Sequence, residues 1–149
     1  MADTKAEPKR LLPQLDPFYE LAIPLAWPVI RIACGWNLAV HGWGKVARGP
    51  AAYTKGFAEM GFDSVGWVWC ALGIEFVGGI ALILGLFTRF FAAAAAIELA
   101  IITALYWHTG FSWLARGYEY TLLWGLVCFG IALRGGGPYS LDRKLGIEL

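Results

Sequence analysis

The stretch Val65–Phe87, VGWVWCALGIEFVGGIALILGLF, decides the fold class of this chain. It is twenty-three residues long with Glu75 as its single charge, and a helix of about 20 apolar residues crosses the hydrocarbon core of a membrane. Over the whole chain, 58% of the residues are hydrophobic and 15% are charged, whereas soluble domains have about 25% charged residues. A water-soluble protein of this composition would expose large apolar patches. The sequence therefore predicts an integral membrane protein.

Three more apolar segments lie before and after this stretch. We expect membrane spans at about 18–40, 65–87, 89–107 and 113–133, in one transmembrane domain (1–149) with a polar N-terminal extension (1–17) and a C-terminal tail (135–149). The predicted fold is all-α, an up-and-down bundle of four helices. In the first outer loop, Pro50–Met60 is expected to form a short helix, either on the membrane surface or as a lid over the bundle.

The distribution of positive charge predicts the orientation. Lysine and arginine number seven on the side that holds both termini and the second loop, and four on the other side. This excess predicts cytoplasmic termini in a multi-pass protein of the cell inner membrane. The net charge of +1 gives no electrostatic case for a nucleic-acid partner. Aromatic residues gather at the predicted outer surface, as an interfacial belt or as a platform for a flat ligand or a partner.

Ionisable residues inside the spans are candidate functional groups, because charges in a membrane are costly. Arg31 lies within the first predicted span, Glu75 in the second and Glu98 in the third. At about 100° per residue, Lys45 projects about 40° and His41 about 80° from Arg31, so all three belong to one broad polar face. Glycines beside Glu75 favour a close approach of another helix. We therefore expect Glu75 to face into the bundle, with Arg31 paired to it or to Glu119.

These charges predict a buried polar centre. Arg31, Glu75 and Glu119 are the predicted catalytic residues, since a neutral carboxyl in a membrane can relay protons. His41, Lys45 and His108, toward the outer ends of the helices, are the predicted binding residues for a quinone headgroup. An alternative is that an Arg31–Glu75 pair only locks two helices together.

The sequence predicts no metal site and assigns no redox role to cysteine. Two histidines and a carboxylate can hold a metal, but interfacial histidines commonly bond only water or headgroups. Three cysteines lie far apart, one in each of three spans, and no CxxC occurs. We therefore interpret Cys34, Cys70 and Cys128 as separate buried structural thiols.

Several motifs resemble those of the DoxX family. The first helix carries Arg31 and His41-Gly-Trp-Gly-Lys45. The second carries Glu75-Phe-Val-Gly-Gly79 and continues to Leu84-Gly-Leu-Phe-Thr-Arg89. Gly117-Tyr-Glu119 resembles the start of the family's last helix, and Gly137-Pro-Tyr-Ser-Leu-Asp142 resembles its closing motif. Glu98 lies outside this pattern, so its role stays open.

The resemblance implies a four-helix membrane protein similar to the membrane subunit of thiosulfate:quinone oxidoreductase and to subunits of redox complexes. We expect a membrane subunit of a quinone-linked oxidoreductase, with lipid, other protein subunits and quinone as its partners. The sequence contains no recognised cofactor motif, so the chain is expected to be at most one subunit of an enzyme. The alternative is a non-catalytic accessory subunit that stabilises a larger respiratory or photosynthetic membrane complex.

Overall fold

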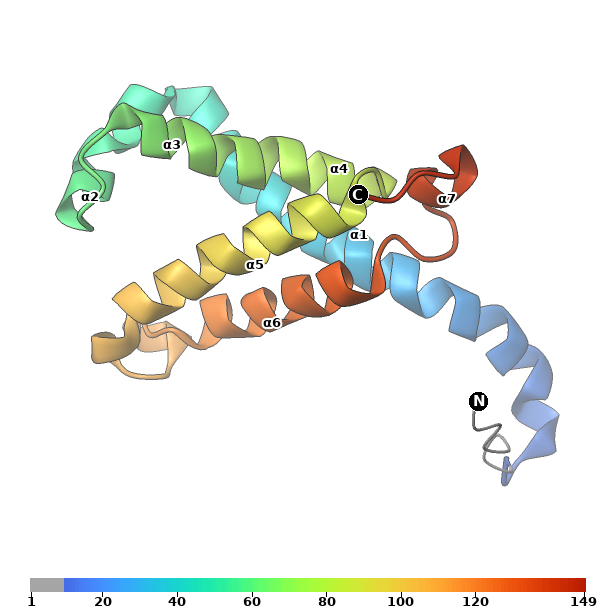
Figure 1. The fold of residues 1–149 in the computed structure, drawn as a ribbon. Coiled ribbons are helices and arrows are strands. Elements are labelled where there is room, and N and C mark those ends of the chain that lie inside the picture. The colour runs from blue at the N-terminus through green and yellow to red at the C-terminus, as the bar shows by residue number, and fades with distance from the viewer. Residues whose placement is uncertain (1–9) are drawn as a thin grey trace, which may run out of the picture.

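The computed structural model describes residues 10–149 and contains only helices and connecting segments in that range. Residues 1–9, with most of the predicted polar extension and two of the lysines used to predict orientation, lie outside the described residues. Four long helical segments run alternately up and down (Figure 1). Within the described range, three segments are long and apolar enough to cross a membrane: Pro13–Arg48, Val65–Leu84 and Thr88–Leu105.

The first helix, α1 (Asp16–Arg48), has 33 residues and is about 50 Å long, which exceeds the thickness of the hydrocarbon core. It begins with Pro17 near its first turn, where proline is tolerated. Pro24 and Pro28 lie inside it, and residues 16–30 bend away from the bundle (Figure 1). Packing on the rest of the bundle begins with Trp27, whose indole N–H donates to the carbonyl oxygen of Gly135 at 2.9 Å, so the packed part begins further along the chain than the predicted span 18–40.

The second long segment runs antiparallel to α1 and consists of α3 (Val65–Leu72), the π-helical η3 (Gly73–Val77) and α4 (Gly78–Leu84). Its backbone touches that of α1, because a Cβ added to Gly35 would lie 2.5 Å from the carbonyl oxygen of Gly79. A Cβ at Gly42 would collide with the backbone of Phe76. Small residues at this crossing allow the close approach that the glycines beside Glu75 predicted.

The loop after α1 contains the predicted short helix, as η2 (Pro50–Tyr53) followed by α2 (Thr54–Glu59). Both elements pack near α3, at the end of the bundle opposite Gly85 (Figure 1). The ring of Tyr53 faces Lys45 of α1, with the ammonium nitrogen 5.6 Å from the ring centroid. The loop therefore covers part of α1 at this end.

The third and fourth long helices, α5 (Thr88–Leu105) and α6 (Glu119–Arg134), pack side by side (Figure 1). The predicted start of the fourth helix at residue 113 differs from the structure, where α6 begins six residues later. Residues 107–118 instead form a compact loop with short turns η4 (Trp107–Thr109) and η5 (Trp113–Ala115). In this loop Arg116 has a left-handed backbone with φ of 60°, which interrupts a helix before α6. A Cβ at Gly117 would collide with the carbonyl oxygen of Gly110, so the loop is tightly folded.

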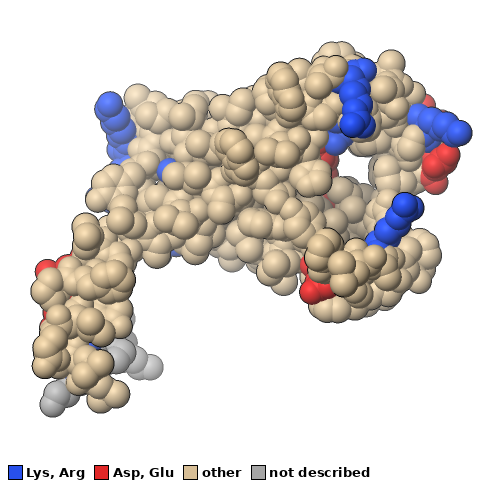
Figure 2. Space-filling view, turned by 180° about the vertical axis from the view of Figure 1, so that it is seen from behind, with Lys and Arg blue, Asp and Glu red and all other residues tan. Residues whose placement is uncertain are grey.

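The pair α5–α6 meets α4 at one end of the molecule and diverges from α3 toward the other end (Figure 1). Viewed from behind, an opening passes between the end that carries α2 and the end that carries the 107–118 loop (Figure 2). Acidic and basic atoms lie at the edge of this opening. We call it the hollow.

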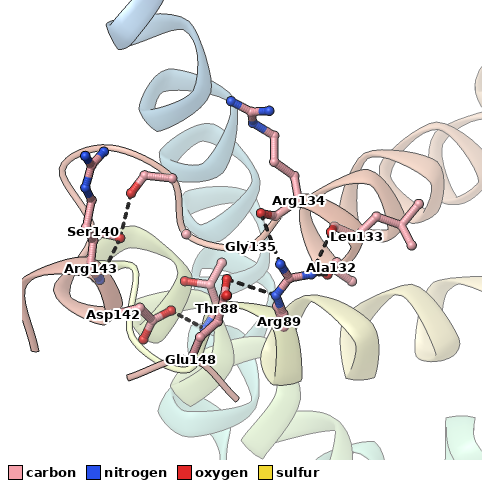
Figure 3. A network of polar contacts seen from close by, with 12 residues as sticks. Thr88, Arg89, Ala132, Leu133, Arg134, Gly135, Ser140, Asp142, Arg143 and Glu148 are labelled. Atoms are coloured by element: carbon pink, nitrogen blue, oxygen red, sulfur yellow. Dashed lines mark hydrogen bonds and ion pairs between the residues drawn. The ribbon is translucent and has the colours of Figure 1, made fainter. Parts of the chain in front are cut away.

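The opposite end is closed by the segment after α6, which includes α7 (Leu141–Leu145). The carboxylate of Asp142 accepts hydrogen bonds from the backbone N–H groups of Phe87 at 2.7 Å and Thr88 at 2.9 Å, so it caps α5 (Figure 3). Arg89 donates to the carbonyl oxygens of Ala132 and Leu133 at the end of α6 and pairs with Glu148 at 2.9 Å. These contacts tie together the ends of α5 and α6.

Candidate functional site

The most deeply placed ion pair joins Lys45 of α1 to Glu75 of η3, with the ammonium donating to the carboxylate. Their side chains are only 10% and 12% exposed. A π-helical turn is often found at functional sites, because the extra residue in the turn redirects its side chains. Here Glu75 is a member of that turn. Two buried charges of opposite sign therefore lie at the α1–η3 contact.

Glu98 of α5 is the third charged group of this cluster. It interacts electrostatically with Glu75 and with Lys45. Its Oε2 atom is buried and has no hydrogen-bond partner among the described residues. One ammonium group faces two carboxyl groups, so the cluster is neutral only when it holds one additional proton. We call Lys45, Glu75 and Glu98 the charged cluster.

Arg31 lies at the other end of the bundle, so its predicted pairing with Glu75 or Glu119 is wrong. Its guanidinium is 1% exposed and donates to the carbonyl oxygens of Gly136 at 2.9 Å and Tyr139 at 3.1 Å. Fourteen residues separate Arg31 from Lys45, which corresponds to about 21 Å along a helix. The predicted common face holds for Arg31 and Lys45, which are both buried, but His41, predicted on the same face, is exposed. The two buried residues make different contacts.

The other predicted site residues do not join the charged cluster. Glu119 is half-buried and accepts a hydrogen bond from the backbone N–H of Trp113 at 3.2 Å. His108 is exposed in the η4 turn. His41 is exposed on α1, with its ring centroid 6.4 Å from that of Tyr120. Among residues 10–149, no group of three or more His, Cys, Asp or Glu side chains is placed to hold a metal ion.

A polar contact between α1 and α6 lies on the same side of α1 as His41. The side-chain amide of Asn37 donates to the hydroxyl of Tyr120. The Tyr120 ring also packs against Trp124, with the ring centroids 6.2 Å apart. Polar and aromatic groups therefore link α1 and α6 at this contact.

Two cysteines that are distant in sequence are neighbours in the structure. The Sγ atoms of Cys34 on α1 and Cys128 on α6 lie 3.1 Å apart, and the side chains are 1% and 0% exposed. Burial of these two thiols was predicted, but their contact was not, and Cys70 is exposed. Cys128 also interacts electrostatically with Glu98. The thiol pair and the charged cluster are therefore neighbouring parts of one buried region.

The membership of Glu98 in the charged cluster was not predicted from the sequence, and neither was the thiol pair. Glu98 was visible as a charge in an apolar span, but its spacing did not reveal which face of the third helix meets the second. Cys34 follows Arg31 by three residues, about one helical turn, which places it on the same broad face. No comparable signal identifies Cys128 as its neighbour.

Comparisons with known proteins identify the family of this chain. A sequence model of the DoxX family matches residues 26–109, more than half of the chain. The chain is 34% identical over 119 residues to a Haemophilus influenzae protein described as uncharacterized, and the match covers 77% of this chain and 87% of that relative. No solved structure matches. The range matched by the family includes all three members of the charged cluster and Cys34, and it ends before Glu119 and Cys128.

Proposed function

Because this chain belongs to the DoxX family and has helices that can span a membrane, we propose that it is the membrane subunit of a quinone-linked oxidoreductase. The observation that carries the proposal is the buried Lys45–Glu75 pair with the carboxyl of Glu98 beside it. Buried ionisable groups in membrane helices are costly, and they commonly mark proton or ligand sites. The charged cluster would be the site at which a quinone headgroup binds and takes up protons.

Quinone reduction consumes two electrons and two protons, so a competent site needs a hydrogen-bond donor and a source of protons. Lys45 offers an ammonium donor that a carbonyl oxygen of the headgroup can accept from. Glu98 has a buried oxygen with no partner in the described part of the chain, so it can hold a proton and hand it on. Glu75 accepts a hydrogen bond from Lys45 and orients its ammonium group. The three residues thus divide binding and proton transfer among them.

In this proposal the quinone reaches the charged cluster through the hollow. The hollow lies between the α2-bearing end and the 107–118 loop, with acidic and basic atoms at its edge (Figure 2). The carbonyl groups of a quinone headgroup can accept hydrogen bonds from basic groups there. His41 and Tyr120 stand on the helices α1 and α6 near this end, and we assign His41 a role as a second carbonyl donor. Arg31 would hold the opposite end of the bundle, whereas Glu119 and His108 would shape the 107–118 loop.

Quinone binding to the purified protein in lipid nanodiscs tests the proposal. We expect a short-chain ubiquinone analogue to bind the native protein and to lose about 10-fold or more in affinity in Lys45→Met, because the buried donor is lost. Glu59→Gln, an exposed acid on α2, is the matched control and should bind normally. Equal binding by Lys45→Met and the control would refute the assignment of the charged cluster as the quinone site.

The accessory-subunit alternative is favoured by a different observation. Residues 16–30 of α1 extend beyond the bundle, and their apolar side chains, including Leu21 at 70% and Val29 at 63%, are exposed (Figure 1). Lipid or an apolar partner helix would cover such a surface. If the chain only supports assembly, Leu21→Asn should lower the yield of the larger complex, while Lys45→Met should leave the turnover of assembled complex unchanged.

A further inference from the structure

Cys34 and Cys128 are placed to form a bond between α1 and α6. Their Sγ atoms are 3.1 Å apart, although 94 residues separate them in sequence. A disulfide bond is about 2.05 Å long, so the two sulfur atoms need to approach by about 1 Å. Side-chain rotation provides movement of this size without displacing a helix. The contact therefore differs from that of two cysteines that merely share a core.

The surroundings of the pair select the kind of oxidant. Both thiols belong to the buried core cluster, next to Leu38, Leu82 and Ile131. Water-soluble oxidants and thiols such as glutathione have poor access to groups buried among membrane helices. A lipid-soluble oxidant can enter from the bilayer, and quinones are two-electron oxidants of this class. Cys70, which is exposed, offers a natural comparison within the same chain.

A proton acceptor also lies beside the pair. Cys128 interacts electrostatically with Glu98, which in turn interacts with Glu75 and Lys45. Thiols react as thiolates, so oxidation requires a group that removes the thiol protons. Glu98, with an oxygen that has no partner among the described residues, interacts with both the thiol of Cys128 and the Lys45–Glu75 pair. The chain thus has an electron source with a proton acceptor near it.

From this arrangement we propose that Cys34 and Cys128 are a redox-active dithiol that forms a disulfide and passes two electrons to a quinone. Two S–H bonds break and one S–S bond forms. The quinone is reduced to a hydroquinone as its two carbonyl oxygens become hydroxyl groups. The two protons leave the thiols through Glu98. The inference rests on the proposed function for the identity of the oxidant, whereas the formation of the disulfide is independent of it.

The number of free thiols before and after oxidation tests the proposal. The reduced protein in nanodiscs is mixed with a short-chain ubiquinone analogue, denatured, and labelled with a maleimide polymer that adds mass to each free thiol. We expect three labels before the reaction and one after it, with one hydroquinone formed per chain by its ultraviolet absorbance. Cys70→Ala should react normally and end with no label. Cys34→Ala and Cys128→Ala should keep both remaining thiols and form no hydroquinone.

Two further measurements separate the parts of the inference. Glu98→Gln should slow disulfide formation by about 100-fold or more if the carboxyl takes the thiol protons, while the oxidised end state stays the same. Failure of iodine to form an intramolecular disulfide in folded protein would overturn the dithiol. A disulfide that forms with iodine but not with the quinone would overturn the quinone as acceptor. Loss of quinone binding in Lys45→Met, measured separately, would still support the proposed function in either case.

Discussion

Glu75→Gln should destabilise the bundle strongly, because it leaves the ammonium of Lys45 buried without its partner. Both side chains are about nine-tenths shielded from solvent. Two unit charges in contact attract by about 4 kcal/mol at an effective dielectric constant of about 20. Removal of one member of a buried pair costs about 3–5 kcal/mol. Glu98 also interacts with Lys45 and can give up its proton to replace Glu75 in part, so we expect a loss near the lower end of this range, about 3 kcal/mol in the free energy of unfolding.

The double variant Lys45→Met, Glu75→Gln tests the physical reason for this loss. Without the ammonium, no buried charge is left unpaired, so the double variant should recover most of the stability. Glu98→Gln should change the free energy of unfolding by less than about 1 kcal/mol, because the Oε2 atom of Glu98 makes no hydrogen bond to the described residues. These free energies are measured by unfolding in mixed micelles with increasing sodium dodecyl sulfate. A Glu75→Gln variant as stable as the native protein, or a double variant less stable than both single variants, would refute the reasoning.

Two other substitutions test the packing on either side of this region. Asp142→Asn should destabilise α5 by about 1 kcal/mol, because it weakens the hydrogen bonds to the N–H groups of Phe87 and Thr88. Amide hydrogen exchange should become faster at the start of α5 and stay unchanged at its end, which serves as the control. Unaltered exchange at both N–H groups would contradict the capping role. Gly42→Ala should lower the free energy of unfolding by about 1–3 kcal/mol, because the added Cβ collides with Phe76. Unfolding in micelles measures this loss, and Gly56→Ala is the control because a Cβ there meets nothing within 4 Å. Equal stabilities would show that α1 and η3 are not in close contact.

The fold class was predictable because hydropathy reports the solvent that surrounds a helix. The stretch around Glu75 is apolar enough to require lipid, and the glycines beside it correctly indicated where another helix approaches. The rotation of Lys45 relative to Arg31 correctly indicated a common buried face. These are local properties of single helices, and each follows from spacing along one segment.

The depth of each charged residue in the membrane could not be predicted in the same way. The first helix is longer than the bilayer is thick, and nothing in its composition shows which part of it packs in the bundle. The centre of the apolar window placed Arg31 midway, whereas the close contacts of Gly35 and Gly42 set the packed part further along the helix. Pairing of Glu75 with Lys45 follows from this shift of the packed part. Contacts such as that of Cys34 with Cys128 depend on how α1 and α6 meet, and this cannot be predicted from the sequence of a single segment.

The contacts made by the segment after α6 constrain when the protein can finish folding during its synthesis. Arg31 binds carbonyl groups of Gly136 and Tyr139, and the first turn of α5 is capped by Asp142. The ribosome makes all of these partners after α1 and α5. The early helices therefore lack these native contacts at one end until the segment after α6 has been translated.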